Sequence, residues 1–399
     1  MGDPRTDPNS PLGRVGARWA DNLQEGFRRE VANLLGRSSD RFPGAQPVSF
    51  SAKHLQELKE RDYWVCEKTD GERFLLWMTN DGPNPLVYFI NRKNDYYYVP
   101  GFIFPHHVPG QDFHRDTILD GELVEDRHPD GRIELNFLVF DMLVLDGKTM
   151  MQRTLDKRMA YFKEQVLKPY GKTGQGPFPV KDKEIQFAYA MDMMFKEVIP
   201  RAKKVHGNDG MIFTCKDTEY HPGTDPHILK WKPPEENTVD FLLHIRWEKH
   251  DFEGMGDAEP DFDAFPAAFE LWIFNGDRGG EAVYIREGDL YVTHDEWEQW
   301  KRMGMPLQDQ IVECFQEDPT ALNGHGNGNA QVNGYSGQHQ VRWRYHRFRH
   351  DKTDANHKST YDSVIVSIRD RVTEADLLKE QVQIRDSWKQ RQAQQGQLR

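Results

Sequence analysis

The sequence predicts an α+β protein of two domains, of which the second is a small β-barrel. The chain has 399 residues, more than one domain usually holds. Up to Pro234, helical spacing of apolar side chains alternates with buried-strand runs, and after it short strands follow one another between Gly-rich turns. We therefore expect an N-terminal segment at 1–20, domains at 21–237 and 238–372, and a charged helix at 373–399.

Composition restricts the class of protein. The net charge of −12 argues against a polycation, so contact with nucleic acid would need a local basic patch. Three scattered cysteines without a C-x-x-C pair argue against a disulfide framework and a cysteine zinc site. No apolar run reaches the length of a membrane span, and no signal-peptide core is visible. We expect a soluble intracellular protein with no membrane partner.

The first domain is predicted to combine several helices with strongly apolar strands. Residues 1–20 are polar and expected to be disordered, and 171–179 are expected to form a linker. The predicted helices are 22–35, 51–59, 155–167 and 191–201, and the predicted strands are 63–66, 74–77, 86–91, 117–125, 135–145, 185–189, 210–215 and 228–231.

The second domain is predicted to be mostly β-structure. One helix is expected at 294–303, and strands at 240–247, 269–274, 282–285, 290–293, 311–315 and 341–348. Several short strands with one helix are typical of the oligonucleotide/oligosaccharide-binding (OB) barrel. Residues 323–340 are rich in Gly, Asn, Gln and His and predict a flexible surface loop.

Two apolar runs flank Asp70-Gly71 within residues 63–78, which is the signature of a β-hairpin. Lys68 would then lie near the end of a buried strand. A lysine that is poor in water and close to other cations has a lowered pKa and can act as a nucleophile. The alternative is an ordinary solvent-facing lysine.

Charged residues recur at other strand ends. Glu122 lies in a predicted strand, and Arg73 and Arg92 add positive charges. Lys230 and Lys232 lie on either side of Trp231, so in a strand they would share one face. One carboxylate among many cations suits an anionic substrate. Phosphoryl transfer is catalysed mainly by positioning and charge neutralisation, which such a set supplies.

The motifs carry a resemblance to a known family. Lys68-Thr69-Asp70-Gly71 is similar to the K-x-D-G signature of covalent nucleotidyltransferases, which include capping enzymes and polynucleotide ligases. Further matches follow in that superfamily's order: LDGELV at 119–124, FLVFDML at 137–143, DGMIFT at 209–214, LKWKP at 229–233 and RFRHDK at 347–352. KTDGER, LKWKPPEENTVDF and the block 343–370 resemble fungal-type mRNA capping guanylyltransferases, and the similarity covers residues 25–392.

The resemblance implies a fold and a reaction. The fold would be a nucleotidyltransferase domain with antiparallel sheets, followed by an OB-fold barrel. Lys68 would attack the α-phosphorus of GTP to give a lysyl–GMP phosphoamide and pyrophosphate. The GMP would then pass to the 5′-diphosphate end of nascent RNA, forming the GpppN cap.

The resemblance also implies roles in nucleotide binding. Arg92 would contact the ribose, and Glu122 would contact the ribose or a metal ion. Phe140 would stack on guanine, although an ordinary core position is the alternative. Lys183 would contact the guanine edge, with Lys181 as a rival. Thr69 and Arg73 complete the expected nucleotide-binding set.

The remaining implied roles concern the phosphates. Lys230 and Lys232 would hold the α-phosphate, and Asp209 would lie near the metal or the nucleophile. Asp240 would face the phosphates from the domain junction. The barrel would contribute a group that reaches the β- and γ-phosphates when the domains close: Arg349, Asp351 and Lys352.

Cofactors and partners follow from the same resemblance. Mg²⁺ or Mn²⁺ is expected to neutralise pyrophosphate. No phosphatase cysteine motif is present, so a separate RNA triphosphatase subunit is expected. The phosphorylated C-terminal repeat of RNA polymerase II is a further expected partner, and both imply the nucleus. Two alternatives remain open: an ATP-dependent polynucleotide ligase and a non-catalytic RNA-binding scaffold.

Overall fold

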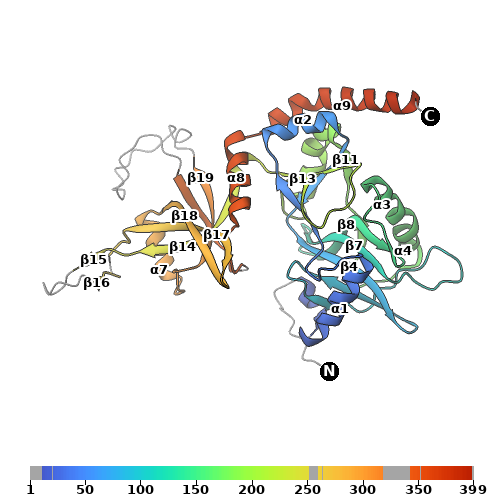
Figure 1. Ribbon diagram of the computed structural model, residues 1–399, viewed down its shortest axis with the longest axis horizontal. Coiled ribbons are helices and arrows are strands. Elements are labelled where there is room, and N and C mark those ends of the chain that lie inside the picture. The colour runs from blue at the N-terminus through green and yellow to red at the C-terminus, as the bar shows by residue number, and fades with distance from the viewer. Residues whose placement is uncertain are drawn as a thin grey trace. The chain divides into compact units, whose positions relative to one another are not determined.

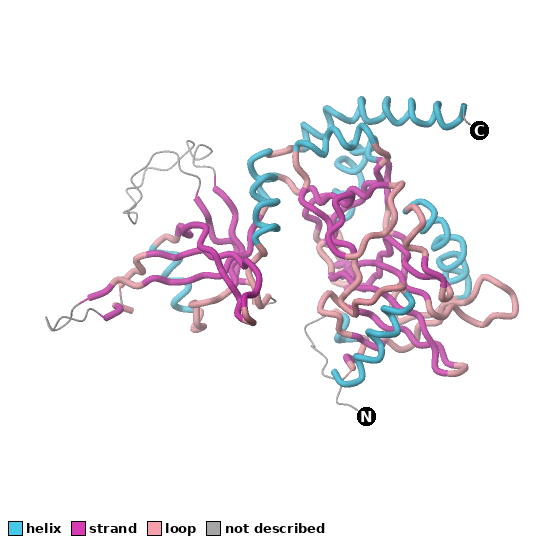
Figure 2. The backbone as a smooth tube through the Cα atoms, viewed as in Figure 1, coloured by secondary structure: helices cyan, strands magenta, loops and turns pink. Residues whose placement is uncertain are grey.

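A computed structural model describes residues 11–19, 21–250, 259–262, 264–317, 342–350 and 352–397. The chain forms two compact units: Met1–Trp231 with Thr373–Arg399, and Lys232–Val372. The predicted loop at 323–340 lies outside the described residues, as does most of the predicted segment 1–20. Figure 1 labels many of the elements of each unit, and Figure 2 separates helices from strands by colour.

The larger sheet of the first unit has eight strands in the order β1-β6-β5-β4-β7-β8-β10, and β9 pairs with β8. Its pairs are antiparallel except β10 with β8. The strands are β1 (Ala17–Arg18), β4 (Glu72–Asp81), β5 (Asn84–Ile90), β6 (Tyr96–Tyr98), β7 (Thr117–Arg127), β8 (Ile133–Leu145), β9 (Lys148–Thr149) and β10 (Val180–Asp182).

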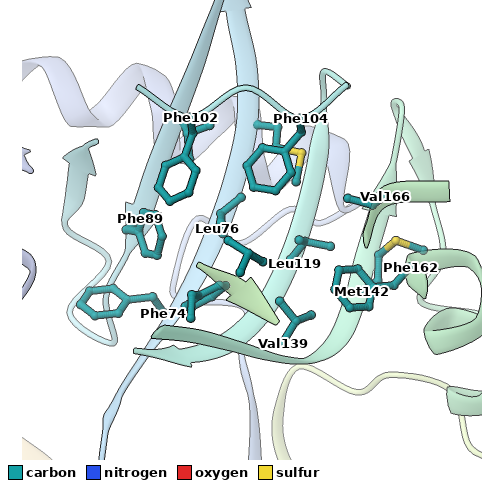
Figure 3. Close-up of a cluster of buried hydrophobic side chains, with 14 of the residues drawn as sticks. Phe74, Leu76, Phe89, Phe102, Phe104, Leu119, Val139, Met142, Phe162 and Val166 are labelled. Atoms are coloured by element: carbon teal, nitrogen blue, oxygen red, sulfur yellow. The ribbon is translucent and has the colours of Figure 1, made fainter. Parts of the chain in front are cut away.

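Both faces of this sheet are buried, because successive side chains of a strand point to opposite faces. In β4, Phe74 and Leu76 enter one core, while Leu75 and Trp77 enter the other. Figure 3 shows the first core, where Phe74, Leu76 and Leu119 pack with Phe89 and other side chains. This packing fixes the register of β4 and β7 beside the pocket described below.

The second sheet has five strands in the order β11-β3-β12-β13-β2, with only β2 and β13 parallel. Its strands are β2 (Ala45–Ser49), β3 (Tyr63–Thr69), β11 (Ile185–Phe187), β12 (Asn208–Cys215) and β13 (Gly223–Trp231). The prediction of an α+β domain with antiparallel sheets is confirmed for the first unit.

The predicted hairpin around Asp70-Gly71 is wrong. β3 pairs with β11 and β12, whereas β4 pairs with β5 and β7, so the two strands belong to different sheets. Gly71 packs so closely on β7 that a Cβ atom there would lie 2.7 Å from the Leu123 carbonyl oxygen. Asp70-Gly71 therefore forms a corner between the two sheets. The prediction failed because the tendency of Asp-Gly to form a turn does not specify which strands pair.

The four predicted helices of the first unit begin within one residue of the prediction, but helix α4 extends through Thr173 into the predicted linker 171–179. Ser51 precedes α2, and its amide donates to His54 Nδ1 at 2.8 Å, which closes the first turn. The predicted helices 155–167 and 191–201 are each interrupted by a π-helical segment, η2 and η4. The elements are η1 (Leu12–Arg14), α1 (Asp21–Leu34), α2 (Ala52–Glu60), α3 (Leu155–Tyr161), η2 (Phe162–Leu167), α4 (Lys168–Thr173), η3 (Ala188–Ala190), α5 (Met191–Met193), η4 (Met194–Val198) and α6 (Ile199–Ala202).

The C-terminal helix α9 (Glu374–Gln397) packs on the first unit, alongside α2 in Figure 1. Arg391 Nη2 lies 2.7 Å from the buried Asp62 carboxylate. Lys59 Nζ lies 2.6 Å from Glu380 Oε2. Trp388 packs on the Tyr189 ring with 4.9 Å between centroids. The helix at the end of the chain thus stabilises the unit in which the chain begins.

The second unit contains a closed five-stranded barrel in the order β14-β17-β18-β20-β19. Its core includes Phe241, Leu271 and Trp343. The predicted strands 282–285 and 290–293 form one strand, β18, with a register shift beside Gly288. Helix α8 was not predicted. The elements are η5 (Pro234–Glu236), β14 (Thr238–Arg246), β15 (Lys249–His250), β16 (Glu259–Pro260), β17 (Ala268–Arg278), β18 (Glu281–Tyr291), α7 (His294–Arg302), β19 (Ile311–Glu317), β20 (Arg342–Phe348) and α8 (Lys358–Asp370).

Candidate active site

A pocket in the first unit lies between its two sheets. The second sheet contributes Cys66, Ile212 and Ile228, and the larger sheet contributes residues of β4, β7 and β8. Seven of the residues predicted to bind nucleotide or to react line this pocket: Lys68, Thr69, Arg73, Arg92, Glu122, Phe140 and Lys183.

Lys68 is held by a β-bulge in the neighbouring strand. In the β3–β12 pair, Thr69 faces Asn208 and Glu67 faces Met211, so Lys68 lies opposite two residues, Asp209 and Gly210. Gly210 has φ of 142°, a conformation that favours glycine. The bulge brings Asp209 Oδ1 to 2.5 Å from Lys68 Nζ, and both side chains keep about a quarter of their surface exposed, 25% and 29%.

A buried ion pair lies beside Lys68. Lys183 Nζ donates to Glu122 Oε2 at 3.2 Å and to Thr69 Oγ1 at 2.7 Å, and Thr69 Oγ1 donates to Glu122. Burial by itself would raise the pKa of Glu122, but the Lys183 ammonium and the Thr69 hydroxyl outweigh it and lower that pKa. Glu122 is therefore a carboxylate in the folded protein.

The floor of the pocket is a second ion pair. Arg73 Nε and Nη2 lie 2.9 Å and 2.6 Å from the two oxygens of Asp120, which is fully buried. The Tyr220 hydroxyl donates to the same carboxylate at 2.6 Å. The Arg73 guanidinium also lies 5.4 Å from the centre of the Phe140 ring. Arg73 thus lines the pocket while its charge is balanced by Asp120.

Three further predicted residues differ in exposure. Phe140 is half-buried and lines the pocket, whereas its neighbours Val139 and Asp141 are buried. Lys183 is buried and lines the pocket, but its rival Lys181 is exposed. Arg92 is exposed at the pocket wall. A ligand in the pocket can therefore contact the aromatic face of Phe140, the buried ammonium of Lys183 and the exposed guanidinium of Arg92.

Lys230 lies on the pocket side of the second sheet. Cys66, Ile212 and Lys230 form one row across β3, β12 and β13, and the first two line the pocket. Lys68 follows Cys66 by two residues and so shares this face. The strand spacing places the Lys68 and Lys230 Cα atoms about 12 Å apart. Lys232 comes after the end of β13 and opens the second unit.

The barrel residues form their own charged group. Asp240 is buried and lies 3.1 Å from Arg349 Nη1, and it also pairs with Lys352. Asn356 receives the Asp240 amide at 3.0 Å, which links the start of β14 to the segment after β20. Asp351 lies outside the described residues. Asp240 therefore orients both barrel cations through its two carboxylate oxygens.

The pocket offers oxygen ligands for a metal ion, but not a complete cage. Glu122 and Asp209 are carboxylates, which suit Mg²⁺ or Mn²⁺. Among the residues that the structure describes, the group of three or more His, Cys, Asp or Glu side chains close enough to share an ion lies elsewhere. Mg²⁺ is commonly held by one or two carboxylates together with substrate phosphates, which these residues fit.

Comparison with known proteins gives the family. The family model for the mRNA capping enzyme catalytic domain matches residues 15–234, and that for the C-terminal domain matches residues 236–378. The chain belongs to the mRNA capping enzyme family.

Curated relatives within the capping enzyme family are similar along nearly their whole length. The mRNA-capping enzyme subunit alpha of Neurospora crassa is 44% identical over 96% of this chain and 94% of the relative. The subunit of Schizosaccharomyces pombe is 42% identical over 91% and 85%. That of Saccharomyces cerevisiae is 30% identical over 93% and 86%.

A solved structure outside the capping enzyme family is also similar. The ATP-dependent DNA ligase of bacteriophage T7 in complex with ATP aligns at a TM-score of 0.35 and 14% identity, over 77% of this chain and 98% of that one. A likeness at this TM-score decides nothing about function.

Sequence reasoning on this capping enzyme family member missed the charges beneath the pocket. Asp141 and Arg158 form a buried pair at 2.6 Å, and Arg158 also lies over the Tyr220 ring. Asp120 and Asp141 each interrupt an apolar strand run, and a charge in such a position needs a partner. That signal was present in the sequence, but it does not identify Arg73 and Arg158 as the partners.

No helix in the described ranges of the chain is long and apolar enough to cross a membrane.

Proposed function

We propose that this chain is the guanylyltransferase of mRNA capping, which takes GMP from GTP onto Lys68 and passes it to the 5′-diphosphate end of RNA. The observation that carries the proposal is the placement of Lys68 Nζ at the wall of the pocket, 2.5 Å from Asp209 Oδ1. A lysine beside a carboxylate that can hold its proton, next to a pocket with an aromatic face and several cations, suits covalent nucleotidyl transfer.

In the first step a bond forms between Lys68 Nζ and the α-phosphorus, and the bond from that phosphorus to the β-bridging oxygen breaks. Pyrophosphate leaves, and the proton lost by the attacking amine goes to Asp209, its hydrogen-bond partner. In the second step a terminal oxygen of the RNA diphosphate attacks the same phosphorus. The phosphorus–nitrogen bond breaks, and Lys68 regains its proton.

The pocket would bind the nucleotide through separate groups. Phe140 would stack on guanine, with Lys183 at the base edge, and Arg92 would contact the ribose. Lys230, on the same sheet face as Lys68, would stabilise charge on the α-phosphate. In the barrel unit, Arg349 and Lys352, oriented by Asp240, would bind the outer phosphates.

A divalent cation is part of the proposal. Glu122 and Asp209 would hold Mg²⁺ or Mn²⁺ together with the phosphates of GTP, and the ion would neutralise the charge of the leaving pyrophosphate. Each carboxylate also contacts a lysine, Asp209 with Lys68 and Glu122 with Lys183, so the ion would depend on the GTP phosphates for its remaining ligands.

The proposal is tested by incubating the full-length chain with Mg²⁺ and α-labelled GTP or ATP. We expect label from GTP alone, and mass spectrometry should find one added GMP on the peptide that contains Lys68. Lys68→Ala should abolish labelling, while the exposed control Lys53→Ala should label normally. Labelling by ATP alone would favour the ligase alternative, and cap formation by Lys68→Ala would exclude the covalent mechanism.

The partners and the compartment belong to the same proposal. The curated relatives are named as alpha subunits, so we propose a partner subunit with RNA triphosphatase activity. We also propose binding to the phosphorylated C-terminal repeat of RNA polymerase II, and a nuclear location. Repeat binding is tested by comparing the affinity of the chain for phosphorylated and unphosphorylated repeat peptides. The nuclear location is tested by imaging the fluorescently labelled chain in cells.

A further inference from the structure

Three histidines and an aspartate converge in the first unit, away from the pocket. Their metal-binding atoms all lie within 4.8 Å of one another: His106, His107, His114 and Asp146. Thr117, whose side chain contacts Asp146, precedes Glu122 by five residues in β7, a rise of about 16 Å. The cluster is therefore separate from the nucleotide pocket.

Asp146 is fixed by the turn between β8 and β9. Its φ of 47° is left-handed, a conformation uncommon for residues other than glycine. The turn holds it there, because the Asp146 amide donates to Thr117 Oγ1 at 2.9 Å and the Gly147 amide donates to the Asp116 carbonyl at 2.9 Å. The carboxylate is thus presented to the histidines by a rigid backbone.

His114 faces two oxygen atoms that only accept hydrogen bonds. Its buried ring lies with Nε2 2.9 Å from the Gln165 carbonyl oxygen and with Nδ1 2.9 Å from Asp146 Oδ1. The carbonyl oxygen is placed to accept from Nε2, so the ring turns its Nδ1 toward the carboxylate. This carbonyl contact is the one that metal-binding histidines usually make with their other nitrogen.

His106 and His107 take different positions. His106 Nδ1 accepts the Val108 amide at 3.0 Å, so Nε2 carries the proton and donates to Asp146 Oδ2 at 3.1 Å. His106 therefore orients the carboxylate. His107 is exposed, and its ring is nearly parallel to that of His114, at 16° with 5.7 Å between centroids. An ion can reach the cluster from the side of His107.

We propose that His107, His114 and Asp146 bind one divalent transition-metal ion, for which Zn²⁺ is the best match, with His106 as a positioning residue. Imidazole nitrogens favour Zn²⁺ over Mg²⁺, and three protein ligands leave a position for water. This ion is distinct from the Mg²⁺ or Mn²⁺ proposed in the pocket.

The test is a titration of the untagged full-length chain, freed of metal, with Co²⁺ as a coloured substitute for Zn²⁺. We expect each chain to bind one Co²⁺ ion, and the bound ion to show the visible absorption of a site with few ligands. Added Zn²⁺ should displace the Co²⁺. His107→Ala should weaken binding at least 10-fold. His107 is exposed, so the variant should fold normally, which circular dichroism checks.

Two more variants make the test specific. His106→Phe keeps a ring in place but removes the hydrogen bond to Asp146, and it should weaken binding about 10- to 100-fold. His221→Ala, which changes an exposed histidine outside the cluster, should bind Co²⁺ as the unmodified chain does. A chain that binds no Co²⁺ in this way, or a His107→Ala variant that binds it equally well, would overturn the proposal.

Discussion

Lys68 lies opposite the bulge of β12 that contains Asp209, and the two side chains meet at 2.5 Å. In a regular antiparallel pair each residue faces one partner, and the side chain of Asp209 would follow the pleat of its own strand. The extra residue, Gly210, rotates Asp209 toward Lys68. The carboxylate that we propose as proton acceptor is thus placed by backbone geometry.

Replacing Asp209 by Asn should slow the formation of lysyl–GMP. The amide cannot take the proton of the attacking amine, so the rate at neutral pH should fall by about 100- to 10,000-fold. The rate should recover as pH rises, because hydroxide then accepts the proton that the amide cannot take. Quenched-flow labelling across pH measures this. Asp217→Asn, at an exposed carboxylate, is the control, and a pH profile of Asp209→Asn equal to that of the unmodified chain would contradict the role.

Replacing Gly210 by Ala should strain the bulge. The φ of 142° is unfavourable for any residue with a Cβ atom, so the free energy of unfolding should fall by about 1–3 kcal/mol. Gly171→Ala is a control of opposite sign, since this helical position has nothing within 4 Å and alanine favours helix by about 0.5–1 kcal/mol. Urea unfolding distinguishes them, and equal effects would argue against strain at the bulge.

Removing the ammonium of Lys183 should destabilise the fold strongly. Lys183→Met leaves the Glu122 carboxylate largely buried without its cation, which costs about 3–5 kcal/mol. The double variant Lys183→Met with Glu122→Gln removes both charges, so it should recover much of that loss. Unfolding free energies of the four proteins form a double-mutant cycle. If the two substitutions were simply additive, the pair would not be coupled.

The same pair predicts a pH dependence. The pKa of Glu122 is lowered from its ordinary 4.5 by folding, so its contribution to stability is present above that value and is lost as pH falls through the folded pKa. The stability difference between the unmodified chain and Glu122→Gln should therefore shrink between about pH 6 and about pH 3. Urea midpoints at a series of pH values measure it, and a constant difference would exclude an ionised Glu122.

Phe140 should matter for GTP binding more than for folding. The ring is half-buried at the pocket, and loss of a stacking face costs about 1–3 kcal/mol per base. Phe140→Ala should raise the GTP concentration needed for half-maximal labelling about 10-fold or more, whereas Phe140→Trp should keep it close to the original. If unfolding free energy fell while GTP binding stayed constant, Phe140 would be a core residue.

The cluster of three histidines and Asp146 illustrates a limit of sequence reasoning. His106, His107 and His114 are close in sequence, but Asp146 follows more than thirty residues later. They meet because β7 and β8 are neighbours, which places the Asp146-Gly147 turn at the end of β8 beside Thr117 at the start of β7. Spacing alone does not match a known metal motif, so the cluster is visible only once the strands are paired.

The sequence by itself determined the family and most of the elements. Apolar periodicity placed α1, α2, β7 and β8 within a few residues, because it reports which face of each element is buried. Ordered motifs picked out seven of the residues that line the pocket, because the proposed chemistry requires particular residue types at particular strand positions. Only the tertiary structure decided which strands pair: β3 and β4 lie in different sheets, and the bulge in β12 aims Asp209 at Lys68. Pairing depends on long-range packing and register, which a local pattern of residues does not contain.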